Sequence, residues 1–240
     1  IFEGNPILEA DLPRIGYLIY GSLLEEGDDL GKELILKVNE RFKGTSIPFN
    51  IQKIADTEQI AYLNQPRVAC IDNIIRELTN NKMKVLNFEE CIRYNKDLPE
   101  SEAVYTELNS IVVYPNSGTW GLLWPQISKI VGMNQSLPLI ISGLNVKKAN
   151  NPEGFKYVET DYTKVKKAPF LPKGGYIIYT KKGLISSSDG VEVANSPDQT
   201  GVSRVCYGMS TRRVITDNNL AYTNSNGRIL IFYNPKGHKN

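Results

Sequence analysis

The fold of this chain is expected to be organised around its C-terminal stretch, which begins with GMSTRRVITD at residues 208–217. The small hydroxyl side chains beside two arginines are typical of a turn, and Thr216-Asp217 has the residue types that cap a helix. An Asn226-Gly227 turn and the apolar run ILIFY at residues 229–233 follow. The stretch therefore predicts a turn, a short helix, a second turn and a closing strand.

This order resembles the C-terminal signature of the small-subunit ribosomal protein S-eight family, which binds the central domain of small-subunit rRNA. In register with that signature, Ser210 falls on the family's Thr, Thr211 on its second Ser and Arg212 on its Lys. Four positions depart from it: Met209, Arg213, Asn226 and Arg228. These departures affect the RNA contacts that the resemblance implies, but not the order of elements.

Two further stretches resemble the same family. Pro66, Ile74 and Leu78 match a helix that opens with Pro and ends in an Ile-Leu pattern. Pro172-Lys173-Gly174, which leads to Tyr179, is similar to the family's Lys-Pro-Gly segment before a Tyr-bearing strand, with Pro and Lys exchanged. The resemblance thus covers about residues 65–90 and 170–234.

The resemblance implies an α+β protein with two small α/β subdomains. Helices and strands are expected in the N-terminal half, and mostly strands in the C-terminal half, with insertions and an N-terminal extension. The expected divisions are an extension at 1–27, an N-terminal α/β subdomain at 28–94, a connecting insertion with strands at 95–160, and a β-rich rRNA-binding subdomain at 161–240.

Hydrophobic periodicity predicts individual elements. Leu30, Leu34, Ile35, Val38 and Phe42 recur at helical spacing and predict a helix over 28–43. The other predicted helices lie at 56–63, from Pro66 to Leu78, and at 120–133, and the predicted strands at 14–20, 47–54, 83–88, 111–114, 137–144 and 176–179. The polar stretch at 95–110 and the Asn- and Lys-rich stretch at 145–162 are expected to be an exposed excursion and a loop.

Composition indicates an ordinary globular protein. Of 240 residues, 41% are hydrophobic and 22% are charged, and the net charge is only +2. Lysines nevertheless concentrate at 163–182, where Lys164, Lys166, Lys167, Lys173, Lys181 and Lys182 lie among few acids. A basic face is one interpretation of this distribution, and a normally solvated surface is the other.

Residue types give little support for metal or catalytic chemistry. Cys70, Cys91 and Cys206 are odd in number and widely spaced, which indicates buried thiols in a reducing compartment. The single histidine, His238, lies near the end of the sequence, where a catalytic or metal-binding role is not expected. Glu89 and Glu90 are expected to be surface charge at the end of a strand. No apolar run reaches the roughly 18 residues of a membrane span.

The resemblance implies a structural, non-enzymatic function in a small ribosomal subunit. Ser210, Thr211, Arg212 and Arg213 would contact the RNA backbone, because compact hydroxyls allow close approach and guanidinium groups pair with phosphate. The supporting residues would be Lys173, Tyr179, Gly227 and Arg228. The partners implied are rRNA and neighbouring ribosomal proteins, with no cofactor, metal, membrane or small-molecule substrate.

The length, the modest charge and the Asn- and Lys-rich composition favour a mitochondrial ribosome over another ribosome-containing compartment.

Three alternatives to the ribosomal interpretation remain open. The Ser-Thr pair could form only a turn with solvated arginines. Tyr20-Gly21-Ser22-Leu23 after an apolar strand is similar to the substrate loop of gamma-glutamyl cyclotransferases, whose backbone amides hold a substrate carboxylate. The chain could also be a protein-only assembly or binding module, such as a virion or secreted component.

Overall fold

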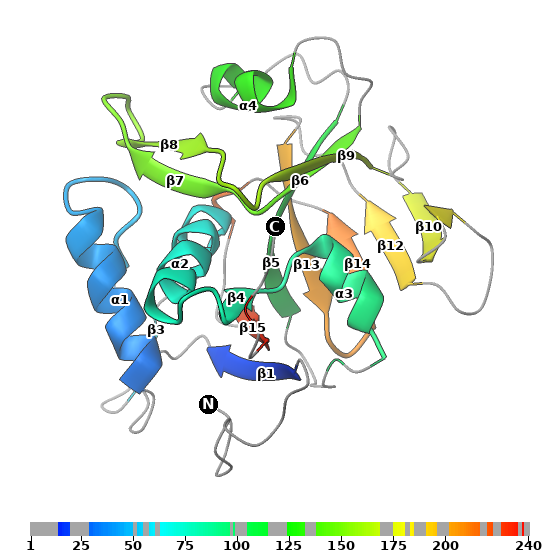
Figure 1. Cartoon of the computed structure of the whole chain (residues 1–240), viewed down its shortest axis with the longest axis horizontal. Helices are drawn as coiled ribbons and strands as arrows, with labels where there is room; N and C mark the ends of the chain where they lie inside the picture. Colours follow the sequence, from blue (N-terminus) through cyan, green and yellow to red (C-terminus); the bar gives the residue numbers. More distant parts are fainter. Residues whose placement is uncertain are drawn as a thin grey trace.

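The computed structural model describes residues 14–19, 29–49, 52–54, 58–60, 63–96, 98, 105–114, 124–132, 138–168, 175–180, 183–184, 191–195, 202–216, 220–222, 227–234 and 237. Within these residues the chain is α+β, with helices in the N-terminal half and mostly strands in the C-terminal half (Figure 1). The predicted fold class is confirmed.

One large sheet joins strands from every part of the chain. Its main path runs β1 (Arg14–Ile19), β15 (Gly227–Tyr233), β5 (Tyr105–Val113), β13 (Val202–Gly208), β14 (Arg213–Thr216), β12 (Val191–Asn195), β10 (Gly175–Thr180) and β11 (Gly183–Leu184). Off this path, β4 (Met83–Val85) pairs with β15, and β6 (Leu139–Ser142) pairs with both β5 and β9 (Lys164–Lys167).

The closing strand β15 lies inside this sheet because both of its faces are apolar. Ile229 and Ile231 pack into one hydrophobic core, while Leu230 and Phe232 pack into a second core on the opposite face. Side chains alternate between the faces of a strand, so a continuous apolar run suits a strand that is covered on both sides. The predicted final strand is therefore confirmed, and it pairs with β1, β4 and β5.

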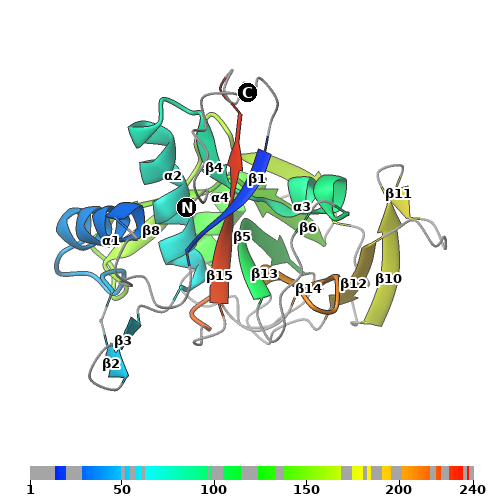
Figure 2. The same ribbon diagram turned by 90° about the horizontal axis from the view of Figure 1, so that it is seen from below.

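Two predicted helices cover the first core. Helix α1 (Asp29–Arg41) buries Leu34, Ile35 and Val38, as the periodicity predicted. Helix α2 (Gln65–Leu78) begins at the Asn64 cap, whose side chain accepts a hydrogen bond from the Arg67 amide. In Figure 2 these helices lie at one end of the molecule, and β10 and β11 lie at the other.

Helix α3 (Phe88–Tyr94) covers the second core and corrects one prediction. The strand expected at 83–88 ends at Val85, and Glu89 and Glu90 belong to the helix rather than to a strand end. The reason is a capping box at Asn87, whose side chain accepts from the Glu90 amide while the Glu90 carboxylate accepts from the Asn87 amide.

Two stretches predicted to be exposed or irregular form strands instead. Within 95–110, β5 starts at Tyr105, and its residues from Thr106 onward are buried, because their polar side chains find partners inside the protein. Within 145–162, β7 (Asn145–Lys148) pairs with β8 (Phe155–Val158). The inward side chains of Val146 and Tyr157 alternate there with exposed lysines, so the predicted loop was wrong.

The remaining elements agree with the sequence in part. Strand β2 (Gln52–Ile54) covers the end of the strand predicted at 47–54, but its partner β3 (Glu58–Ile60) lies where a helix was predicted. Helix α4 (Trp124–Val131) lies within the helix predicted at 120–133, and β1, β6 and β10 match predicted strands. The short helix expected after Asp217 falls outside the described residues.

Candidate functional site

The predicted Ser-Thr-Arg-Arg turn connects strands β13 and β14. Gly208 pairs with Arg213 at the end of this hairpin, and residues 209–212 form the turn between them. Met209 is fully buried and anchors the turn, whereas Ser210 and Thr211 are exposed. The predicted turn is therefore confirmed, and within it the Thr211 hydroxyl donates to the Gly208 carbonyl at 3.4 Å.

Both arginines of the turn contact protein groups. Arg212 has φ 53° and donates through Nη1 to the Asn95 carbonyl at 3.3 Å. Arg213 donates through Nε to the Glu192 carboxylate of β12 at 2.8 Å. An anion that binds at this turn must therefore compete with these contacts or share the guanidinium groups with them.

The other predicted site residues are spread across the sheet. Tyr179 lies on β10 opposite Val191, and Gly227 starts β15 opposite Tyr105, with Arg228 next to it opposite Thr106. Five strand-to-strand steps separate β15 from β10, which corresponds to about 24 Å at ordinary strand spacing. Lys173 falls outside the described residues. Tyr179 and Gly227 lie on opposite sides of the turn, each two strands from the β13–β14 hairpin, or about 10 Å at ordinary strand spacing.

A cluster that the sequence did not reveal lies between β5 and β13. It consists of Tyr105, Glu107, Arg204 and Tyr222, and is called here the Glu107–Arg204 cluster. Glu107 is 0% exposed and Arg204 3% exposed, and their side chains form an ion pair. The Arg204 guanidinium lies 4.8 Å from the ring centre of Tyr105 and 4.5 Å from that of Tyr222.

Within this cluster the Arg204 guanidinium is charged and the Tyr105 hydroxyl is neutral. Burial lowers the pKa of Arg204, but the neighbouring Glu107 raises it, and the net direction is upward. Burial, followed by the charge of Glu107, raises the pKa of Tyr105, so its hydroxyl stays protonated at neutral pH. A buried charged pair with shifted neighbours is typical of a functional site, although structural ion pairs share this property.

The cluster reaches the surface through Tyr222, which is 40% exposed. The segment that carries Tyr222 is held against α2, because the Gln65 amide donates to the Leu220 carbonyl at 3.2 Å. Leu220 itself is buried in the first core. The N-terminal end of α2 thus positions the tyrosine that covers Arg204.

Strand β1 ends close to the level of Glu107 in the sheet. Ile19, its last residue, pairs with Ile229, and Ile229 pairs with Glu107 on the next strand. Tyr20-Gly21-Ser22-Leu23, which resembles a cyclotransferase loop, follows directly in the sequence and lies outside the described residues. Strand β1 therefore ends two strands away from the buried carboxylate.

A second buried ion pair lies on α2. The Asp72 carboxylate accepts from the Val85 amide at 2.7 Å, from Asn109 Nδ2 at 2.8 Å and from Arg76 Nε at 3.1 Å. The Arg76 guanidinium lies 4.2 Å from the ring centre of Tyr162. This network connects α2 to β4 and β5, and its partners indicate a structural role.

The described residues contain no group of three or more His, Cys, Asp or Glu side chains that could hold a metal ion. The three cysteines are free and buried, as predicted, and burial raises the pKa of Cys70 to about 12. No helix in the described part of the chain is long and apolar enough to cross a membrane. His238 lies outside the described residues.

Comparison with known proteins returned no matching family model, no matching curated protein and no matching solved structure.

Proposed function

We propose that the chain is a small-molecule enzyme and that the Glu107–Arg204 cluster is its active site. The observation that carries the proposal is a fully buried carboxylate joined to a buried guanidinium beneath a partly exposed tyrosine. The proposal departs from the non-enzymatic function expected from the sequence. It does so because the fold brings together two charged residues that are 97 positions apart.

The charges of the cluster fit a substrate that carries both an ammonium and a carboxylate group. Arg204 presents a planar fork that can bind a carboxylate, and Glu107 can accept a hydrogen bond or a proton from an amine. Such a zwitterion would exchange one internal ion pair for two external ones. The two charges of the protein would then not be left without counter-ions.

The resemblance of Tyr20-Gly21-Ser22-Leu23 to a cyclotransferase loop narrows the substrate to a γ-glutamyl compound. In the proposed reaction the substrate's α-amine attacks its own γ-carbonyl carbon, which forms a five-membered lactam and breaks the bond to the departing amine. Because an ammonium group has no free electron pair, Glu107 first takes a proton from it, and the neutral α-amine then attacks. The attacking nitrogen loses a second proton as the lactam forms, and the departing amine takes up both protons and leaves as an ammonium group. No oxidant or cofactor enters this balance.

Amino-acid release from γ-glutamyl-alanine tests the proposal. Glu107→Gln should lower kcat by about 100-fold or more, as expected for loss of a general base, and Ser22→Ala should abolish turnover. Glu77→Gln is the matched control, since Glu77 forms an ion pair that lies at the surface. If the wild-type protein releases no alanine, or if Glu107→Gln and Glu77→Gln are equally active, the proposal fails.

The second candidate is a small-subunit ribosomal protein of the S-eight type that binds rRNA in a mitochondrial ribosome. It is favoured by the exposed hydroxyl side chains of Ser210 and Thr211 beside two arginines. RNA crosslinking with peptide mapping should then locate contacts at 173–182 and 208–228. Replacement of both Arg212 and Arg213 by Ala should weaken binding and reduce its salt dependence. Crosslinks confined to other segments would argue against this candidate.

A further inference from the structure

Residues 138–168 form one long, bent β-hairpin. Strand β6 continues through Gly143 into β7, and the returning strand β8 continues through residues 159–163 into β9. The bend is held where the hydroxyls of Thr160 and Thr163 both donate to the Gly143 carbonyl, at 2.9 and 3.0 Å. The hairpin is thus an ordered arm that extends from the central sheet (Figure 1).

The far end of this arm is fixed to the loop after α1. Ser46 donates to the Glu153 carbonyl through both its backbone amide, at 3.3 Å, and its hydroxyl, at 3.0 Å. Lys148 Nζ donates to the Lys43 carbonyl at 3.2 Å. The arm is therefore supported at both ends, and its outer side chains are presented on a fixed backbone.

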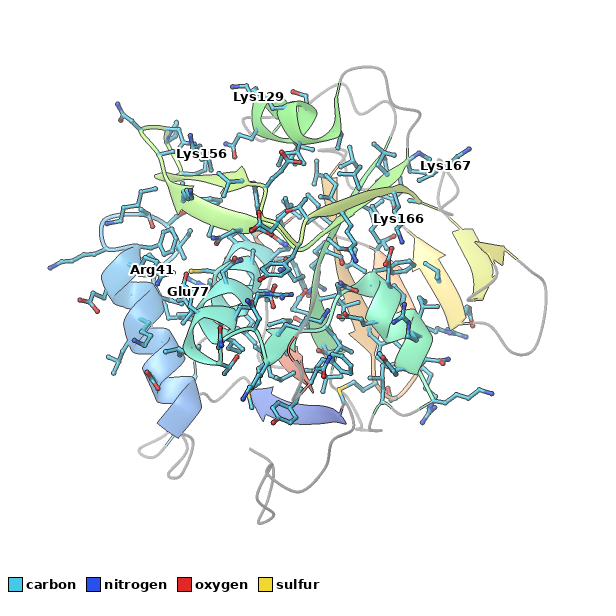
Figure 3. All side chains as sticks on the ribbon, in the orientation of Figure 1. Arg41, Glu77, Lys129, Lys156, Lys166 and Lys167 are labelled. Carbon is cyan, nitrogen blue, oxygen red and sulfur yellow. The ribbon has the colours of Figure 1, made fainter. Side chains whose placement is uncertain are left out.

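Lysine dominates the surface of this arm, which is called here the lysine hairpin. It carries six lysines, all exposed, and three acidic residues, whereas the whole chain has a net charge of +2. The six are Lys147, Lys148, Lys156, Lys164, Lys166 and Lys167. Figure 3 shows Lys156, Lys166 and Lys167 along this part of the molecule, with Lys129 of α4 nearby. The lysines of β9 face both ways, since Lys166 lies opposite Ile140 of the second core and pairs with Glu89, while Lys167 lies opposite Leu139 of the first core.

The register of β7 and β8 places two of these lysines directly opposite each other. Lys147 pairs with Lys156, while the neighbouring pair, Val146 and Tyr157, points into the core. Like charges directly opposite each other destabilise a two-stranded ribbon. The lysine pair therefore opposes folding, and the buried pair beside it provides the stabilisation.

Protection of a sheet edge explains only part of this pattern. Among the described strands β9 pairs with β6 alone, and lysines on an edge strand prevent pairing with other chains. That role does not require lysine opposite lysine in β7 and β8. A Lys-Glu pair would protect the ribbon as well and would also stabilise it.

We infer that the outer face of the lysine hairpin, which the paired Lys147 and Lys156 present, binds the phosphate backbone of single-stranded nucleic acid. Among the described residues the exposed large hydrophobic side chains are Leu36, Leu78 and Tyr222, and none of them lies on the hairpin. Protein interfaces are usually anchored by apolar or aromatic side chains, which this face lacks, whereas an anionic membrane attracts lysines by charge and is therefore one arm of the test. A phosphate chain needs only charge, which is what this face provides.

The inference is independent of the proposed enzyme, and it locates nucleic-acid contact away from the turn at 208–213. The test measures fluorescence anisotropy of a labelled oligouridylate roughly 12 nucleotides long with the full chain, across a range of salt concentrations. Lys147→Glu combined with Lys156→Glu should weaken binding by at least about tenfold at low salt. It should also reduce the slope of log K against log salt by about 1.4.

The matched control combines Lys37→Glu with Lys82→Glu, which changes the net charge equally but lies outside the hairpin. Thermal melting and far-UV circular dichroism show whether each variant is folded. The milder pair Lys147→Gln and Lys156→Gln repeats the test without charge reversal.

Three results would overturn the inference. The first is an equal loss of binding in the hairpin variant and in the control, which would show that only net charge matters. The second is binding to vesicles that contain phosphatidylserine without binding to the oligonucleotide, which would indicate a membrane surface. The third is loss of binding in the Arg212→Ala and Arg213→Ala variant but not in the hairpin variant, which would place the contact at the turn.

Discussion

Helix α2 carries two ion pairs of the same chemistry on opposite faces. On its inner face Asp72 and Arg76 have side chains that are only 2% and 7% exposed. On its outer face Glu77 pairs with Arg41 of α1 at 2.7 Å, and these side chains are 57% and 43% exposed (Figure 3). The comparison shows that the neighbours of an ion pair, rather than its distance, determine what it contributes to the fold.

The inner pair is part of a network, whereas the outer pair connects two helix surfaces. Asp72 also holds the Val85 amide of β4 and the Asn109 side chain of β5, so its loss leaves several buried groups without a partner. The outer pair can exchange its contacts for water, which screens the attraction between the charges. The first and the last of the following predictions test this difference directly.

The largest effect is expected from Asp72→Ala. It should lower the free energy of unfolding by about 3–5 kcal/mol, because it leaves Arg76 as an uncompensated buried charge. Urea unfolding of the purified chain measures this loss. Asp72→Asn keeps an acceptor for the Val85 amide, so it should lower the free energy of unfolding by less. A loss below about 1 kcal/mol for Asp72→Ala would show that the inner and outer pairs are equivalent.

Alkaline pH should next lower the free energy of unfolding, through the buried thiols of Cys70 on α2 and Cys91 on α3. Burial raises the pKa of Cys70 from 9.0 to about 12, and burial also raises the pKa of Cys91. Above pH 9 the unfolded chain loses the thiol proton while the folded chain keeps it, so stability falls as pH rises from about 9 to about 12. The expected slope is about 1.4 kcal/mol per pH unit for each thiol.

Urea unfolding between these pH values measures the slope. Cys70→Ala removes one of the two thiols and should make the slope shallower, whatever its effect on stability at neutral pH. An unchanged slope in this variant would exclude Cys70 as a source of the pH dependence.

Gly143→Ala should disturb the inner face indirectly. Gly143 has φ 74°, and a Cβ atom there would lie 2.6 Å from the Tyr162 carbonyl oxygen, while the Tyr162 ring lies over Arg76. The variant should lower the free energy of unfolding by about 2–3 kcal/mol, because backbone strain and a steric clash act together. Thermal unfolding measures it.

Gly132→Ala separates these two contributions. Gly132 also has φ 74°, but its Cβ position has no neighbouring atom within 4 Å, so only the backbone strain of about 1 kcal/mol remains. Equal losses in the two alanine variants would show that the contact with Tyr162 contributes nothing.

The smallest effect is expected from Arg41→Ala on the outer face. Exposed ion pairs contribute about 0.2–1 kcal/mol, and salt near 1 M should remove most of that difference. Urea unfolding at low and high salt measures both quantities. A loss as large as that of Asp72→Ala would remove the distinction between the two faces.

The sequence predicted much of α2 but not the difference between its two faces. Pro66 and the apolar stripe of Ile71, Ile74, Ile75 and Leu78 predicted the helix and its buried side. The structure confirms the helix and buries the three isoleucines, but leaves Leu78 41% exposed. Asp72 and Arg76 have the same spacing as an ordinary surface pair, because helical spacing is local. The strands that cover them are distant in the sequence.

The capping box of α3 was visible in the sequence but was not used. Asn87 followed three residues later by Glu90 is a helix-start signal, and it would have replaced the predicted strand end. The strands β7 and β8 were missed because exposed lysines and asparagines obscured a two-residue alternation only four residues long.

Of the two candidate sites, the sequence predicted only the turn at residues 209–212 and not the Glu107–Arg204 cluster. The exposed Ser210 and Thr211 were expected there, but the partners of Arg212 and Arg213 were not. Glu107 lies in a polar stretch that was expected to be exposed, and no local pattern distinguishes an acid that points inward. It becomes a site residue only through its pairing with Arg204.

By itself the sequence determined the α+β class, the helices α1 and α2, the turn before β14 and the apolar closing strand, because helical periodicity, turn residues and apolar runs act over a few neighbours. Only the tertiary structure decided which polar residues are buried. Glu107 meets Arg204 across 97 positions and Asp72 meets Asn109 across 37, so burial depends on strand pairing between distant segments.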